Sequence, residues 1–130
     1  MKKPHIVDEA RNLVETGYIG NVTVEDVIAN IEAVIADPKF RAGMDAICDY
    51  TDASAVWNLA ELDRLRKYVL KIRPLVGNTR WAVIFPKGKD TTTARIFIAL
   101  HNAFDSQIKI KLFNNRHDAH AWLDEARVLG

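Results

Sequence analysis

The chain has 130 residues, 48% of them hydrophobic and 27% charged, with a formal net charge of +1 at pH 7. This length suits one domain with a single core, and the small net charge provides no overall field for nucleic acid or for an anionic membrane. The N-terminal MKKPHIVDEARN contains no signal-like apolar run, and no later stretch approaches the roughly 18 apolar residues of a membrane span, so we expect a cytoplasmic protein.

Two short strands and a helix are predicted first. HIVDEA at 5–10 and LVETGYI at 13–19 have the pattern of antiparallel partners joined by a tight turn. From residue 24 the apolar residues recur at helical spacing, and Thr23 with Asp26 forms a T-x-x-D capping box. This predicts a helix over 24–36, which ends before an Asp-Pro pair.

The middle of the chain predicts a strand, a helix and a second strand. MDAICDY at 44–50 is strand-like, and the helix that follows has an Asn58–Glu61 cap and is expected to end at Pro74. RWAVIFP at 80–86 is apolar enough to be a central strand that is covered on both faces.

The C-terminal part predicts a helix, an edge strand and a last helix. The first begins near Asp90, and its apolar face is expected to comprise Ile96, Phe97, Leu100 and Phe104. In IKIKLF at 108–113, apolar residues alternate with two lysines. This pattern is typical of a strand at the edge of a sheet, where lysines prevent pairing with another sheet. The last helix starts at an Asn115 cap and is expected to bury Ala119, Trp122, Leu123 and Ala126. The order ββαβαβαβα predicts an α/β domain, 1–130, with one mostly parallel sheet flanked by helices.

The stretch FPKGKDTTTARIF at 85–97 resembles a phosphate-binding loop, but its spacing differs from that of a Walker motif. Val83 stands where a glycine is required, and Asp90 where a serine or threonine would bind magnesium. Cations and hydroxyls still gather at a helix N-terminus, which favours anions: Lys87, Lys89, Thr91, Thr92 and Arg95. The alternative is that Asp90 or Thr91 caps the helix while the lysines are solvated.

Reaction centres and metal sites are not evident in the sequence. DYTDAS at 49–54 should leave its strand beside the 85–97 loop, but the acidic pair and the lysine of a phosphoryl-accepting receiver are replaced by GNVT and NNRHD. Cys48 reads as an inert buried thiol, and His117 with His120 lacks a third metal ligand. We therefore expect no enzyme, no cofactor and no metal. The candidates for an enzyme would be Asp49, Asp52 and Lys89.

The whole chain resembles the SpoIIAA-like members of the STAS superfamily. The segments that carry the resemblance are YIGNVTVEDV, DPKFRAGMDAICDYTDAS, ARIFIAL and LFNNRHDAHAWL. The F-R-x-G-M-D pattern is similar to that of an uncharacterised bacterial branch that is grouped with lipid-binding SEC14-like domains. The resemblance implies a domain that docks to protein partners and carries no chemistry of its own. In the anti-sigma-factor antagonists of this superfamily, phosphorylation of a serine in a D-S-S-G-like motif switches the docking. The corresponding segment of this chain is AVWNLAEL, which has Asn58 near the serine position and no glycine after it. We therefore expect no such phosphorylation switch.

Two hypotheses follow. The first is a non-catalytic, regulatory interaction module that binds a protein partner through the loops after the second, third and fourth strands, with a homodimer through a helix face left open. Its candidate residues are Asn21, Thr51, Asp52, Ser54, Asn58, Lys87, Lys89 and Thr91. The second is a domain that holds a small apolar or anionic ligand between the helices and the sheet edge near Trp57, Trp81 and Phe85. The alternative for these three aromatics is that they are ordinary core residues.

Overall fold

The computed structural model describes residues 2–105 and 107–129, with side chains as far as residue 125, and has the predicted element order. The strands are β1 (Ile6–Asp8), β2 (Leu13–Asn21), β3 (Asp45–Ser54), β4 (Thr79–Ile84) and β5 (Ile108–Phe113). The helices are α1 (Val24–Ile35), α2 (Leu59–Val76), α3 (Thr92–Phe104) and α4 (Arg116–Leu129). The strands form one sheet in the order β1-β2-β3-β4-β5, with β1 antiparallel to β2 and all other neighbours parallel. The predicted α/β fold is therefore confirmed, including a central β4 and an edge strand β5.

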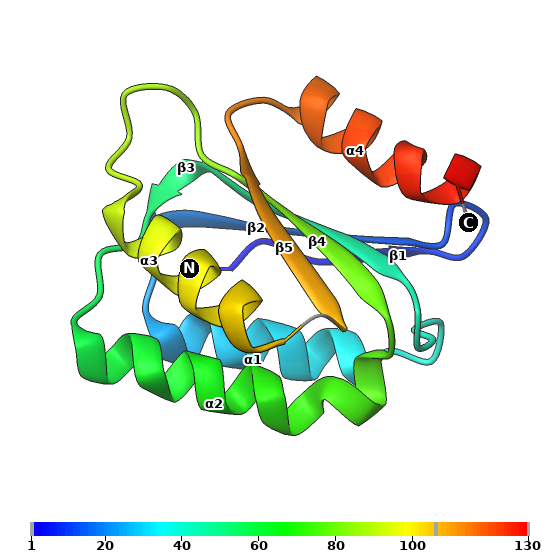
Figure 1. Ribbon diagram of the computed structural model, residues 1–130, viewed down its shortest axis with the longest axis horizontal. Helices are drawn as coiled ribbons and strands as arrows, with labels where there is room; N and C mark the ends of the chain where they lie inside the picture. The colour runs from blue at the N-terminus through cyan, green and yellow to red at the C-terminus, as the bar shows by residue number, and fades with distance from the viewer. Residues whose placement is uncertain (1, 106, 130) are drawn as a thin grey trace.

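The two faces of the sheet are covered by different helices. Figure 1 shows α4 on one side of the sheet and α1 and α2 on the other. The α4 face holds a small apolar cluster of Leu13, Ile47, Ala82, Ile84, Ala119 and Leu123. The predicted burial of α4 is confirmed at Ala119 and Leu123, and Trp122 is half-buried against them, whereas Ala126 lies outside the described side chains. The larger core lies on the opposite face, under α1, α2 and α3.

Strand β3 is longer than predicted and reaches Ser54. It pairs with β2 across a bulge, since Gly17 is opposite Asp49 whereas Ile19 is opposite Asp52. The extra β3 residue lets the two ladders continue in parallel to their ends. The prediction that the strand ends at Tyr50 and that DYTDAS leaves it is therefore wrong. Four candidate residues are strand residues and not loop residues: Asn21, which ends β2, and Thr51, Asp52 and Ser54 in β3.

The predicted helix starts are confirmed where a capping side chain was identified. Both hydrogen bonds of the capping box are present between Thr23 and Asp26. At α2, the Asn58 carboxamide oxygen accepts the Glu61 N–H at 2.8 Å, and the Glu61 carboxylate accepts the Asn58 N–H at 3.0 Å. The Asn115 carboxamide oxygen accepts a backbone N–H in the first turn of α4 at 2.8 Å. These bonds satisfy amides that have no partner within the helix.

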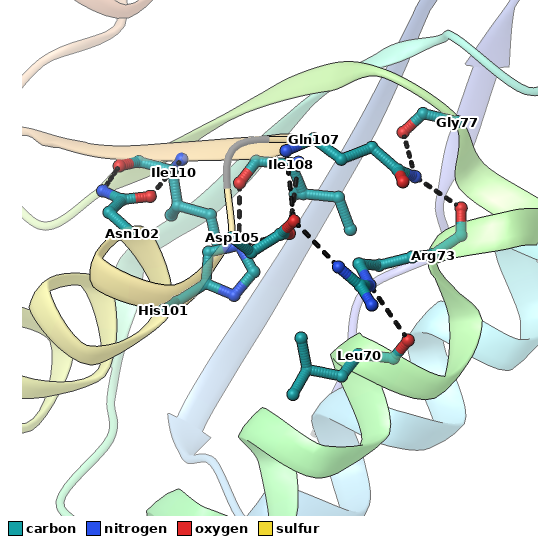
Figure 2. Close-up of polar contacts among 9 residues, drawn as sticks. All are labelled: Leu70, Arg73, Gly77, His101, Asn102, Asp105, Gln107, Ile108 and Ile110. Atoms are coloured by element: carbon teal, nitrogen blue, oxygen red, sulfur yellow. Dashed lines mark hydrogen bonds and ion pairs between the residues drawn. The ribbon is translucent and has the colours of Figure 1, made fainter.

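Helix α2 does not end at Pro74, as predicted, but continues to Val76. A proline in a helix has no N–H to donate to the carbonyl four residues earlier, which here is that of Leu70. The Arg73 side chain compensates by donating its Nε–H to the Leu70 carbonyl at 3.3 Å (Figure 2). The last turn of α2 therefore remains helical despite the proline.

A buried polar cluster joins the ends of α2 and α3 to the start of β5 (Figure 2). The Asp105 side chain is 3% exposed and accepts from the N–H groups of Gln107 and Ile108 at 3.1 and 3.3 Å. It also pairs with Arg73 at 3.2 Å and contacts Nε2 of His101 at 3.3 Å. Burial alone would raise the pKa of Asp105, but two backbone donors and the Arg73 guanidinium outweigh it and hold that pKa below its usual value. The Gln107 amide donates to two carbonyls at the end of α2, at 2.7 and 2.9 Å, so the cluster fixes α2 against α3.

Helix α3 buries a different face from the one predicted. Phe97 is buried as expected, together with two polar residues, Thr93 and His101. Both can be buried because each has a partner: the Thr93 hydroxyl accepts the Trp57 N–H at 3.2 Å, and His101 Nε2 lies 2.7 Å from the Ile108 carbonyl oxygen. The predicted apolar residues Ile96, Leu100 and Phe104 are consequently turned to the surface.

Candidate functional site

A cavity of about 110 Å³ lies between the sheet and helices α1, α2 and α3. Its floor includes Thr16, Cys48 and Val83, which stand in register on the neighbouring strands β2, β3 and β4. These strands are covered by helices, yet all three side chains are only half-buried. They keep this exposure because they face the cavity.

Aromatic side chains stand at both ends of this floor. Toward the C-terminal ends of the strands, Tyr18 stacks on Tyr50 at 4.9 Å between ring centroids, and Tyr50 stacks on Phe85 at 4.6 Å. Two residues before Val83 on the same face of β4, Trp81 also lines the cavity. Space remains because short side chains separate the large rings on the sheet, which prevents the helices from closing onto the floor.

The remaining walls come from apolar faces of the three helices. Residues that contribute to them include Val27, Ile31 and Val34 from α1, Leu65 and Val69 from α2, and Ala94, Phe97 and Ile98 from α3. The α1 face follows from the helical spacing that predicted this helix. The polar cluster around Asp105 ties α2 to α3 and so holds two of the three walls in place.

The cavity is electrically neutral at pH 7. Its lining, among the residues that the structure describes, contains no aspartate, glutamate, lysine, arginine or histidine. Burial raises the pKa of the Cys48 thiol to about 11, which fits the predicted inert thiol. Burial also raises the pKa values of the Tyr18 and Tyr50 hydroxyls, so both stay protonated. Such a lining disfavours ions, since a charge transferred here would lose its hydration without gaining a counter-charge.

Asn30 is a polar residue of the cavity that sequence reasoning missed. It lies on α1, its side chain is 1% exposed, and its Nδ2 donates to the Tyr18 hydroxyl at 3.1 Å. Its Oδ1 is buried without a hydrogen-bond partner. The sequence did carry a signal, because Asn30 stands three residues after Val27 and four before Val34, within the apolar stripe of the helix.

Trp57, Trp81 and Phe85, the aromatics named from the sequence, all line this cavity. Trp57 follows β3, and its indole N–H donates to the Val22 carbonyl at 2.8 Å. The three therefore do not simply fill the core, because they enclose a space within it.

The polar residues predicted at the ends of β2 and β3 are paired with one another or with close neighbours. The Ser54 hydroxyl donates to the Asn21 side chain at 2.9 Å, and Asp52 pairs with Lys3 at 2.8 Å. Thr51 bonds to the Asp49 carboxylate within the bulge, and Asn58 caps α2. The fold thus gathers these side chains at the C-terminal ends of neighbouring parallel strands. Several of them are engaged in hydrogen bonds, an ion pair or a helix cap that stabilise this end of the sheet.

The loop after β4 holds the predicted cations at the surface. Lys87 and Lys89 are exposed, and α3 begins at Thr92, two residues later than predicted. The Asp90 carboxylate accepts the Thr92 N–H at 2.9 Å, while the Thr91 hydroxyl accepts from a nearby arginine and not from the helix backbone. Asp90 therefore performs the capping role, and its negative charge opposes an anion at this helix end.

Two of the candidates for catalysis, Asp49 and Asp52, have separate structural partners. Asp49 accepts from Arg116 at 3.0 Å, whereas Asp52 binds Lys3. Burial would raise the pKa of Asp49, but bonds from Thr51 and the charge of Arg116 lower it overall, so the carboxylate is ionised at neutral pH. Within the described residues, no three His, Cys, Asp or Glu side chains converge as metal ligands.

Of three comparisons with known proteins, the one with solved structures identifies the fold. No protein-family model matches the chain, and no curated protein matches it either. Among solved structures, the chain is similar to an uncharacterised protein of the DUF3478 family with a SpoIIAA-like fold from Shewanella loihica PV-4, at 20% sequence identity and a TM-score of 0.53. The match covers 85% of this chain and 83% of that one. It confirms the SpoIIAA-like fold expected from the sequence. Among the described helices, none has the length and apolar character needed to cross a bilayer.

Proposed function

We propose that this domain is a non-catalytic binding module whose ligand is a small, neutral, mainly apolar compound held between the sheet and helices α1, α2 and α3. The observation that carries the proposal is the cavity of about 110 Å³ with its apolar, uncharged lining. Apolar cavities of about 150 Å³ in other proteins bind molecules of the size of benzene. The ligand, or the part of it that is buried, is therefore about the size of one aromatic ring.

An anionic ligand, which the sequence left open, is less well supported at this site. Lysines that could neutralise an anion, such as Lys87 and Lys89, lie in the exposed loop after β4 and not among the residues that line the cavity. Transfer of a charge into a dry apolar space is strongly unfavourable unless an opposite charge meets it. The buried part of the ligand is accordingly neutral.

Native mass spectrometry of the freshly purified protein tests the proposal directly. We expect a fraction of the protein to carry additional mass that is lost on denaturation. In parallel, toluene at increasing concentration should raise the melting temperature, because a ligand that binds only the folded state stabilises it by mass action. An unliganded mass together with an unchanged melting temperature at saturating toluene would rule out the proposed site.

A second function, docking of a protein partner, is supported by a groove on the surface between α2 and α3. Leu59, Leu100 and Phe104 line it, and Leu59 and Phe104 are each 73% exposed. An ion pair between Arg66 and Asp63, at 2.8 Å, forms its polar edge. Exposed apolar side chains grouped beside a polar rim are typical of protein contact surfaces. We propose an apolar segment of another protein as the occupant.

Affinity capture from the native host tests this second function. The wild-type protein should retain a partner in a fixed ratio, and Phe104→Ser should lose it. Val56→Ser is the matched control, since Val56 is 69% exposed but lies outside the groove. Equal capture by the wild type and Phe104→Ser would exclude the groove as the docking site of the partner. Size-exclusion chromatography at increasing concentration would identify a second copy of this chain as the occupant.

A further inference from the structure

Asn30 carries an unpaired, fully buried hydrogen-bond acceptor in the wall of the cavity. Its side chain is 1% exposed and lines the cavity, and its Oδ1 has no hydrogen-bond partner. A buried amide oxygen without a donor is unfavourable, and most such atoms in folded proteins are paired. Asparagine is also a poor choice in the middle of a helix. The bond from Nδ2 to Tyr18 accounts for the nitrogen of this amide but not for its oxygen.

The hydroxyl beside Asn30 supplies the complementary donor. The Tyr18 oxygen accepts from Asn30 Nδ2 at 3.1 Å. A phenol oxygen has two lone pairs and one hydrogen, so this accepted bond leaves its own hydrogen to be donated. Asn30 and Tyr18 thus place an acceptor and a donor next to each other at one end of an otherwise apolar space.

From this pairing we propose that Asn30 is the specificity-determining residue of the cavity and that the ligand carries one neutral hydroxyl group. The inference rests on the proposed function, because it assigns the polar part of the same ligand. A hydroxyl is the group that fits, since it can donate to Asn30 Oδ1 and accept from Tyr18 at once. A hydrocarbon would leave Oδ1 unpaired, and a carboxylate would place an acceptor against an acceptor. The class is therefore a small aromatic or alicyclic alcohol.

Phenol and toluene are the probes that test the inference, because they are nearly isosteric and differ in the hydroxyl. Dissociation constants for both are measured by calorimetry on the wild type, Asn30→Leu and Thr16→Val. The absolute preference also depends on the cost of dehydrating phenol, so the informative quantity is how the ratio of the two constants changes with each variant. Thr16→Val is the matched control. It removes a polar atom from the same lining, but one that already donates to the Ile47 carbonyl at 3.2 Å.

We expect Asn30→Leu to weaken phenol binding by roughly three- to tenfold relative to toluene binding, the effect of one lost neutral hydrogen bond. Thr16→Val should leave the ratio within about twofold. An unchanged ratio in Asn30→Leu, or an equal change in both variants, would overturn the inference while toluene binding still supported the cavity. If neither probe binds the wild type, the proposed function and this inference both fail.

A measurement on the wild type covers the case in which Asn30→Leu does not fold. In a nitrogen-15 spectrum, the side-chain NH₂ resonances of Asn30 should move on saturation with phenol by clearly more than with toluene, since a hydrogen bond to Oδ1 polarises the amide. Equal movement with the two probes would show that the amide does not distinguish the hydroxyl, and would overturn the inference.

Discussion

Adding one methylene group to the floor of the cavity should stabilise the protein and weaken ligand binding. Val83→Ile is the suitable change, because Val83 lines the cavity on the central strand β4 and isoleucine keeps the β-branched shape that strands favour. A void of about 110 Å³ costs about 2.6 kcal/mol at ~24 cal/mol per Å³. Burying one additional methylene should recover about 0.8 kcal/mol of this cost. For a chain of 130 residues, that is a rise in melting temperature of about 3 °C.

Differential scanning calorimetry and urea titration measure the stability change, and toluene titration measures the loss of binding. Val56→Ile is the matched control, since it makes the same chemical change at a side chain that is 69% exposed, and its effect should stay within about 0.5 kcal/mol. A Val83→Ile variant that is less stable than the wild type, beside an unaffected Val56→Ile, would mean that the floor has no room for a methylene. The reasoning from the cavity would then be refuted.

Three further predictions concern the framework and the surface. Asn58→Ala should lower the free energy of unfolding by about 1 kcal/mol, and Asn58→Ser should lower it much less, because serine caps as well. Equal melting temperatures of Asn58→Ala and the wild type would contradict the assignment of Asn58 as the cap. Asp105→Asn should cost about 1.5–3 kcal/mol at pH 7 through the loss of its charged bonds, including that to Arg73. The pKa of Asp105 is lowered in the folded state, so its contribution to stability is complete above the unfolded-state pKa of ~3.9 and is lost as the pH falls through the folded-state pKa. In urea titrations, the free energies of unfolding of the variant and the wild type should therefore converge in acid. A difference that stays constant with pH would contradict this. Lys87→Ala and Lys89→Ala should leave thermal melts nearly unchanged but weaken a partner docked at the Gly88 loop, and undiminished binding would make this loop a simple connection.

Much of the fold could be predicted because its signals are local. The capping boxes at Thr23 and Asn58 mark helix starts within four residues of sequence, and alternation in IKIKLF marks an edge strand. The errors occurred where a side-chain hydrogen bond overrode a local rule. Pro74 did not end α2, because the Arg73 side chain bonds to the freed Leu70 carbonyl and Gln107 holds the helix end.

The face of α3 shows the same limit. Apolar spacing favoured Ile96, Leu100 and Phe104 as the buried stripe, yet the helix buries Thr93 and His101 with Phe97. The polar residues can be buried only because the chain brings a backbone N–H and a carbonyl oxygen to them. Those partners belong to other segments, so a pattern within the helix could not identify them.

The sequence by itself determined the order and type of the elements, because helical and strand periodicity and caps depend on residues a few positions apart. It also named Trp57, Trp81 and Phe85 as aromatics that either flank a ligand at the sheet edge or fill the core. Only the tertiary structure decided that a cavity exists there. Parallel pairing sets the short side chains of Thr16, Cys48 and Val83 in one row across three strands, and packing turns α1 so that Asn30 closes over the same space. A void arises from the summed shapes of side chains that are far apart in the chain, and no local pattern in the sequence encodes that sum.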